Sequence, residues 1–522
     1  MTGLLDPAGA LSPEAVRYLP GARRHCAGVL ADLRAGLSCV WLFPDAEVES
    51  DRADRAVEQV VHGLDHAVEA PGKGTAPRPA PVAAVPHARD PWEPDGGGGR
   101  GGGAWAAHPS EDALDIDDGF GDWDPFGVFA GAGAGAGVRA SGGPSLAPVV
   151  DEPVLDGLLL DALIPAARPA DDRDGDVAAR LARSLGLDGD LVSELVGAAD
   201  GGAPVLVVRA WTEADPYAVS RLVRRFQAAV KEAGLKPSDR PRLLVASRLQ
   251  DLEADTVGLL DATVSRPHWW WGVWSHLDTA TVVADAMPHP GSGHAHSRMT
   301  PTKLIRHALR RETVVQTAGP DLGLAVELAR AWNGRTGDLA SALRECRPTG
   351  GAVDPGAQGR GTPAAAYAPL PESGLRETWS AGLVDSWEGQ IRHGLGSGAR
   401  GSGGAELDKL VWQAQNRVLL PLIDDARLGF VELLPRIAVR GVARLVDTYA
   451  RQSPRDTRGA PPDAASLELG ELYHAAVQRD ITLTDEQFGR LRTLRQARNK
   501  LAHRTPVDDA LLHELVEALA GF

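Results

Sequence analysis

The sequence predicts a multidomain protein in which an α/β domain with a parallel sheet precedes an all-α helical bundle, with long disordered linkers. Three observations predict this fold class. The 522 residues are too many for one hydrophobic core. In the first part of the chain, short apolar runs alternate with segments of helical period. After residue 404, by contrast, every apolar pattern has the helical period alone.

The first ordered stretch, residues 1–69, opens with a helix and continues into a buried strand. A Ser-Pro-Glu sequence at Ser12 is typical of a helix start, and Gly36 is typical of a helix end. The run Leu37–Pro44 is apolar throughout, as in a strand buried on both faces of a sheet. Residues 51–70 then return to the helical period.

The same alternation continues in residues 152–345. Apolar runs at Ala203–Trp211 and 240–248 predict two more buried strands, and the segment between them, 215–234, begins with an Asp-Pro helix cap. Strands that alternate with helices favour a parallel sheet. The run TATVVADAM, residues 279–287, is a candidate for a last strand.

Two segments have the composition of linkers. Residues 70–151 are rich in Gly, Pro and Ala and bury too little apolar area to offset chain entropy, so we expect disorder. Within them, the acidic and aromatic island 111–129 is a candidate docking peptide for a protein partner, although aromatics scattered in a solvated linker explain it equally well. Residues 346–403 predict a second linker with a short helix. The candidate docking side chains are Phe120, Trp123 and Phe126.

The charge of the chain is uneven. The formal net charge is −16, from 54 basic and 70 acidic residues, which argues against a protein that coats nucleic acid with its whole surface. From Glu406 onward, however, 16 Lys/Arg face 17 Asp/Glu, a balance of −1, so the first 405 residues carry −15. The C-terminal bundle is therefore the least acidic part.

The cysteines and the apolar runs indicate a compartment. Cys26, Cys39 and Cys346 form no CxxC pair, which suggests neither a disulfide framework nor a zinc site. The N-terminus lacks the pattern of a signal peptide, and no apolar run approaches the length of a membrane span. We expect a cytoplasmic protein without membrane contact.

A nucleotide or metal site is not expected. A P-loop needs glycines and a lysine after its strand, but Leu37–Pro44 is followed by DAEVESDRADR, with carboxylates where a phosphate would sit. The Gly-Lys pair at 71–75 lacks the upstream glycine, because Ala67 occupies that position. Three histidines in a Gly-rich loop have no acidic or thiol partner at a defined spacing. These histidines are His289, His294 and His296.

The bundle, residues 404–522, carries the candidate chemistry on a helix expected over 484–503. One stripe at helical spacing faces the core: Leu491, Leu494, Ala497 and Leu501. A second stripe, at steps of 3, 4 and 4, is exposed and cationic: Arg492, Arg495, Asn499 and His503.

These residue types suit RNA cleavage without a metal. A histidine can remove the 2′-OH proton or protonate the leaving 5′ oxygen. An arginine can hold the scissile phosphate, and an asparagine can orient it. Two such helices face to face would supply both an acid and a base, so we expect a homodimer. The alternative is a solvated basic face on which His503 only caps the helix.

The sequence RNKLAH, Arg498–His503, resembles the Rx4–6H motif of the HEPN superfamily, and the resemblance covers about 404–522. It implies an α-bundle that dimerises around the motif, RNA as substrate, and a metal-independent endoribonuclease without cofactors. Other members of the superfamily have lost catalysis and bind only RNA or protein partners. The catalytic residues it implies are Arg498, Asn499 and His503. From the basic run of the same helix we also expect RNA-binding side chains, at Arg492, Arg495, Lys500 and Arg504.

Residues 311–334 resemble the stretch that follows the nucleotide core in inactivated STAND-like P-loop NTPases, and Trp269–Trp274 before Asp278 fits the same pattern. The resemblance covers 12–68 and 152–345. It implies a degenerate P-loop-like sensor or scaffold that no longer hydrolyses ATP; an α/β domain of another family is the alternative.

Together the two resemblances imply an antiphage-defence effector whose endoribonuclease is regulated by an inactive NTPase-like domain. The alternative is a non-enzymatic adaptor of a multi-protein defence complex.

Overall fold

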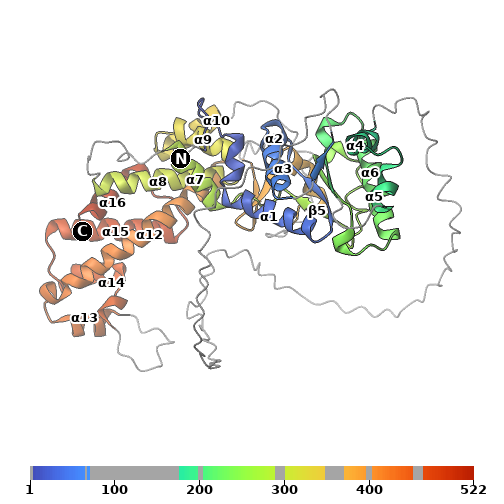
Figure 1. Ribbon diagram of the computed structural model, residues 1–522. Coiled ribbons are helices and arrows are strands. Elements are labelled where there is room, and N and C mark those ends of the chain that lie inside the picture. The colour runs from blue at the N-terminus through green and yellow to red at the C-terminus, as the bar shows by residue number, and fades with distance from the viewer. Residues whose placement is uncertain are drawn as a thin grey trace, which may run out of the picture. The chain divides into compact units, whose positions relative to one another are not determined.

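The computed structural model describes eight stretches of the chain (Figure 1), which are 4–64, 67–70, 176–197, 204–287, 300–346, 370–394, 403–450 and 463–521. Several predicted features lie outside them. These are the Gly-Lys pair at 71–75, the docking peptide 111–129 with Phe120, Trp123 and Phe126, and the histidines His289, His294 and His296.

A five-stranded sheet with the order β2-β3-β4-β1-β5 organises the first part of the chain, and all its pairings are parallel. Every residue of β1 is buried, as expected of a strand covered on both faces. The three predicted strands are confirmed as β1, β3 and β4. The strands are β1 Ser38–Leu42, β2 Ala67–Glu69, β3 Val205–Arg209, β4 Arg242–Ser247 and β5 Ser265–Trp269.

The sequence did not predict strands β2 and β5, and its prediction of a strand over 279–287 is wrong. β2 is only three residues long, and β5 contains Pro267, which an edge strand tolerates because its missing N–H faces no neighbour. The expected strand 279–287 is instead part of helix α7, His276–Ala286. Ser275 starts this helix: its hydroxyl accepts from Asp278 N, and the Asp278 carboxylate accepts from Ser275 N at 2.8 Å. This reciprocal cap overrides the strand-like run of Thr and Val that follows.

Helices surround the sheet and continue after it. The helices of this region are α1 Pro20–Arg34, α2 Asp45–Glu49, α3 Arg52–His62, α4 Val177–Leu185, α5 Leu191–Gly197 and α6 Pro216–Glu232. After α7 come α8 Pro301–Ala318, α9 Leu322–Ala331 and α10 Leu339–Cys346, which share a separate hydrophobic cluster with α7.

An aromatic cluster fills the core beside β1. Trp41 lies 4.7 Å from Phe43 and 6.0 Å from Trp270 between ring centroids, and Trp270 lies 5.4 Å from Trp274. The tryptophan run Trp269–Trp274 packs in the core, because each of its four tryptophan residues is at most 7% exposed.

His25 belongs to this cluster, and protonation of its imidazole is expected to lower the free energy of unfolding. Trp41 Nε1 donates to Nε2 of His25 at 3.0 Å, so the imidazole is neutral. Burial, with a smaller effect from nearby His268, lowers the pKa of His25 from 6.5 to about 4. The unfolded chain therefore binds more protons between these values, and the free energy of unfolding should rise with pH across that window.

The test is the His25→Gln variant, whose amide can still accept from Trp41. The free energy of unfolding in urea should differ less between about pH 4.5 and about pH 7 in the variant than in the wild type. The reduction should be at most about 3 kcal/mol. An unchanged pH dependence would rule out this role of His25.

Residues 370–394 are more structured than the predicted linker with a short helix. Helix α11, Arg376–Ser380, is followed by an antiparallel hairpin of β6, Val384–Trp387, and β7, Gln390–His393. The two-residue turn between the strands has positive φ at both positions, the geometry that matches strand twist. Trp379 is fully buried and donates to the Trp270 carbonyl at 3.2 Å, so this segment belongs to the α/β core.

The C-terminal region is helical, as predicted. Its helices are α12 Gly403–Ile437, α13 Val442–Tyr449, α14 Leu469–Val477, α15 Asp485–Ala502 and α16 Asp509–Ala520. Helices α12 and α13 are separate because the chain turns at Gly441 with φ +84°. Helix α8 packs along α12 and adds Leu309 to the bundle core. None of the helices in the described stretches is long and apolar enough to cross a membrane.

Candidate functional site

Helix α15 is fixed at both ends by local hydrogen bonds. At its start, Thr484 Oγ1 accepts from Gln487 N at 3.1 Å, and the Gln487 side chain accepts from Thr484 N at 3.0 Å. This reciprocal capping starts α15 at the position from which the sequence predicted a helix. The predicted core stripe is also confirmed, since its four members are at most 1% exposed.

The C-terminal end of α15 positions His503. Its backbone N–H donates to the Asn499 carbonyl at 3.1 Å, which makes His503 the last capping residue, and the chain then turns through Arg504 with φ +56°. From the long helix α12, Trp412 Nε1 donates to the Leu501 carbonyl at 2.7 Å. The turn that carries the imidazole is therefore held by the bundle, while the imidazole itself is exposed.

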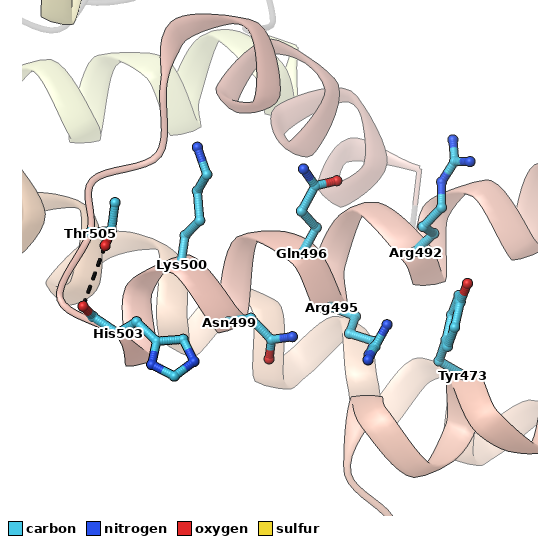
Figure 2. Close-up of a pocket in the computed structure, with 8 residues that line it drawn as sticks. All are labelled: Tyr473, Arg492, Arg495, Gln496, Asn499, Lys500, His503 and Thr505. Atoms are coloured by element: carbon cyan, nitrogen blue, oxygen red, sulfur yellow. Dashed lines mark hydrogen bonds between the residues drawn. The ribbon is translucent and has the colours of Figure 1, made fainter.

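A surface pocket of about 540 Å³ lies along this helix (Figure 2). Figure 2 shows two rows of side chains along α15, one with Arg492, Gln496 and Lys500 and the other with Arg495, Asn499 and His503. The rows follow from the four-residue spacing within each of them. The full lining is Tyr473, Arg492, Arg495, Gln496, Asn499, Lys500, His503 and Thr505.

The structure brings together five of the seven residues predicted for the RNA site, namely Arg492, Arg495, Asn499, Lys500 and His503. Arg498 and Arg504 do not line the pocket. At about 100° per residue, Arg498 lies about 60° further around the helix than Arg495, and its Nη2 is 3.9 Å from Glu468 Oε2.

Two cations of the pocket have no carboxylate partner among the residues that the structure describes. Within the described stretches, Arg492 and Arg495 form no ion pair, whereas many other arginines do. Lys500 is the exception among the pocket cations, because its Nζ lies 2.5 Å from Asp508. In a protein of net charge −16, two unpaired arginines in one pocket make it attractive to an anion.

Tyr473, Gln496 and Thr505 were missed at the sequence level. Tyr473 comes from α14, and the Arg495 guanidinium lies 4.5 Å from the centroid of its ring. The Tyr473 ring also stacks on the ring of Phe488, with 5.4 Å between the two ring centroids. An aromatic residue in the helix before the basic stripe was the available signal, but the packing of α14 on α15 decides which of its residues reaches the pocket.

The carboxyl edge of the sheet is acidic, unlike the α15 pocket. In an α/β domain this edge is where a nucleotide would bind. Helix α2 begins directly after β1 and places Asp45 and Glu47 in its first turn. The nearby cations are already paired: Arg52 with Glu47 at 2.7 Å, and Arg248 with Asp251 at 2.8 Å. A phosphate at this edge would meet carboxylates and the negative field they produce.

Comparison with protein-family models, with curated proteins and with solved structures gives no match to the chain.

If the pocket binds RNA, as the sequence predicts, replacing Arg492 and Arg495 together by glutamine should weaken that binding and lower its salt dependence. Each arginine that no longer neutralises a phosphate of a single strand should lower the slope of log affinity against log salt by about 0.7, so the double variant should lower it by about 1.4. Binding of a fluorescent single-stranded RNA over a salt series measures this. Arg436→Gln/Arg440→Gln, two exposed arginines elsewhere in the bundle, is the matched control. An unchanged slope in the first variant would exclude these arginines as phosphate ligands.

Proposed function

We propose that the α15 pocket binds RNA and that the chain is a metal-independent endoribonuclease. One observation carries the proposal: a histidine, an asparagine amide and two unpaired arginines line the same open pocket. Imidazole, amide and guanidinium are groups that can perform phosphodiester cleavage without a metal.

In the proposed reaction His503 removes the proton of the 2′-OH, and the 2′ oxygen attacks the adjacent phosphorus. Arg495 binds the phosphate and stabilises its growing charge, while Asn499 orients it. The bond from phosphorus to the 5′ oxygen then breaks, which leaves a 2′,3′-cyclic phosphate and a 5′-hydroxyl. A second copy of the chain would supply a second imidazole to protonate the leaving oxygen, and its approach would bring Arg498 to the same phosphate.

The wider role we propose is that of an antiphage-defence effector, as the HEPN and STAND-like resemblances imply. The α/β region would act as a sensor for a protein partner rather than as an ATPase. The carboxylates at the edge of its sheet support this assignment, because they disfavour a bound phosphate.

A non-enzymatic RNA-binding scaffold is the second candidate function. It is favoured by the position of Arg498, which lies beside Glu468 and outside the pocket, and by the presence of one histidine in the lining. Such a pocket would hold RNA without providing both an acid and a base.

Incubating the purified full chain with total RNA in excess chelator separates these functions. The endoribonuclease should shorten the RNA, whereas the scaffold should bind it and leave it intact. RNA that is neither bound nor cut would contradict both proposals.

A further inference from the structure

A short loop, residues 504–508, leads from His503 to helix α16 and forms one end of the α15 pocket. Thr505 of this loop lines the pocket beside His503, and its hydroxyl donates to the His503 carbonyl at 3.4 Å (Figure 2). Arg504 has φ +56°, so the chain reverses direction directly after the histidine. The position of the imidazole therefore depends on what holds this loop.

Gln415 of α12 holds the far end of the loop through both groups of its amide. Gln415 Nε2 donates to the Val507 carbonyl at 2.8 Å, and Val507 N donates to Gln415 Oε1 at 2.7 Å. Gln415 is 1% exposed and Val507 is fully buried, so water does not compete for either hydrogen bond. One side chain thus satisfies both backbone groups of Val507.

The near side of the same turn is held by a neighbour of Gln415 on α12. Trp412 Nε1 donates to the Leu501 carbonyl at 2.7 Å. Trp412 and Gln415 are three residues apart, so they lie on the same face of α12. One turn of α12 therefore binds the chain both before and after His503, at Leu501 and at Val507.

The packing of the bundle does not explain an amide at position 415. The other buried residues of α12 between 410 and 419 are apolar, namely Leu410, Val411, Ala414 and Leu419. A leucine at position 415 would bury apolar area, whereas a buried amide is costly unless its hydrogen bonds are made. The loop that Gln415 binds accounts for the amide.

An ion pair also reaches the loop, but it lies in solvent. Lys500 Nζ is 2.5 Å from Asp508 Oδ2, and the two side chains are 33% and 57% exposed. An exposed ion pair contributes little to holding a structure, because water and salt screen it. The buried amide is therefore the stronger of these two anchors.

We propose that Gln415 is a positioning residue of the α15 pocket, which fixes Val507 and so holds the His503 imidazole where it can reach an RNA 2′-OH. This inference rests on the proposed endoribonuclease function. Gln415 does not line the pocket, so it acts through the loop. A displacement of a catalytic group by about 1 Å can lower a rate by about 10². Loss of the anchor should therefore affect the chemical step more than RNA binding.

Single-turnover cleavage by the full chain, at saturating RNA in EDTA and below the melting temperature, tests this role. Gln415→Ala should lower the maximal rate by about 10–100-fold. The RNA dissociation constant should stay within about twofold of the wild-type value, because Arg492 and Arg495 are unchanged.

Leu434→Ala is the matched control for a bundle that is only destabilised. Leu434 is fully buried in the same helix, about 28 Å further along it than Gln415. Its variant should cleave at nearly the wild-type rate. Equal maximal rates in Gln415→Ala and Leu434→Ala would overturn the proposal.

Gln415→Glu supplies a pH profile. A protonated carboxyl can donate to the Val507 carbonyl and accept from Val507 N, whereas a carboxylate can only accept. Burial raises the pKa of such a carboxyl, so the anchor should be present at about pH 5 and lost toward about pH 8. The cleavage rate relative to the wild type should therefore fall as pH rises in Gln415→Glu and stay constant in Gln415→Ala. A constant ratio in Gln415→Glu would contradict the two-point anchor.

Hydrogen exchange without RNA separates this proposal from the proposed function. The Val507 amide should exchange at least about tenfold faster in Gln415→Ala than in Leu434→Ala, because it has lost its buried acceptor. Equal exchange would overturn the anchor whether or not RNA is cut. Faster exchange in a chain whose wild type cuts no RNA would contradict the endoribonuclease, and with it the catalytic consequence of the anchor.

Discussion

His503→Ala is expected to lower the rate of RNA cleavage by about 10²–10⁴, the usual contribution of a general acid or base. RNA affinity should change little, because the arginines of the pocket remain. Thermal stability should also hold, since the exposed imidazole makes no hydrogen bond in the described residues and only the backbone of His503 caps α15. Single-turnover cleavage of a labelled single-stranded RNA measures the rate.

The matched control for this variant is His474→Ala. His474 is also exposed and also belongs to the bundle, but it lies on α14 beside Tyr449 and does not line the pocket. It should cleave at the wild-type rate. If the His503 variant cleaved as fast as this control, His503 would have no catalytic role.

Trp41→Ala is expected to lower the free energy of unfolding by about 3–5 kcal/mol. The indole is fully buried in β1, an interior strand of the sheet, and it contacts Phe43, Trp270 and His25. Its removal leaves a cavity that these rigid rings cannot fill, and it also leaves the His25 acceptor without its donor. Urea unfolding followed by far-ultraviolet circular dichroism measures the loss.

Tyr217→Ala provides the comparison for this prediction. Tyr217 is an aromatic residue of α6 that is 58% exposed, so its replacement should change the free energy of unfolding by about 0.5 kcal/mol or less. A loss below about 1 kcal/mol for Trp41→Ala would mean that the aromatic cluster does not organise the α/β core.

The sequence correctly predicted the strands that are formed by apolar runs and the helix whose core-facing side chains are all apolar. β1, β3 and β4 are continuous apolar runs, and α15 has a core stripe that is apolar at every step. β5 was missed because Arg266, Pro267 and His268 interrupt it, and it pairs only at the edge of the sheet. The hairpin β6–β7 was hidden in a segment whose spacing also fits a helix.

Part of the candidate site could likewise be predicted from the sequence, and part of it could not. Helical spacing alone places Arg492, Arg495, Asn499 and His503 on one side of α15. The exclusion of Arg498 depends on its angle around the helix and on Glu468, which precedes α14. The inclusion of Tyr473 depends on how α14 packs. Contacts between helices decide both, and no local pattern in the sequence encodes them.

Many arginines of the chain are neutralised by carboxylates, as the strongly acidic composition favours. Arg209 pairs with Asp54 at 2.8 Å, and Arg52 pairs with Glu47 at 2.7 Å. Against this background Arg492 and Arg495, which form no ion pair within the described residues, stand out, and they are the reason that the proposed function concerns a phosphate-bearing ligand.

The chemistry of the RNA ends tests the central claim, cleavage at the α15 pocket without a metal, most directly. The full chain and its His503→Ala variant are incubated in EDTA with a defined single-stranded RNA, and the product ends are identified by mass spectrometry. We expect a 2′,3′-cyclic phosphate and a 5′-hydroxyl from the wild type and intact RNA from the variant. Intact RNA in both samples, or products with 5′-phosphate ends, would contradict the claim.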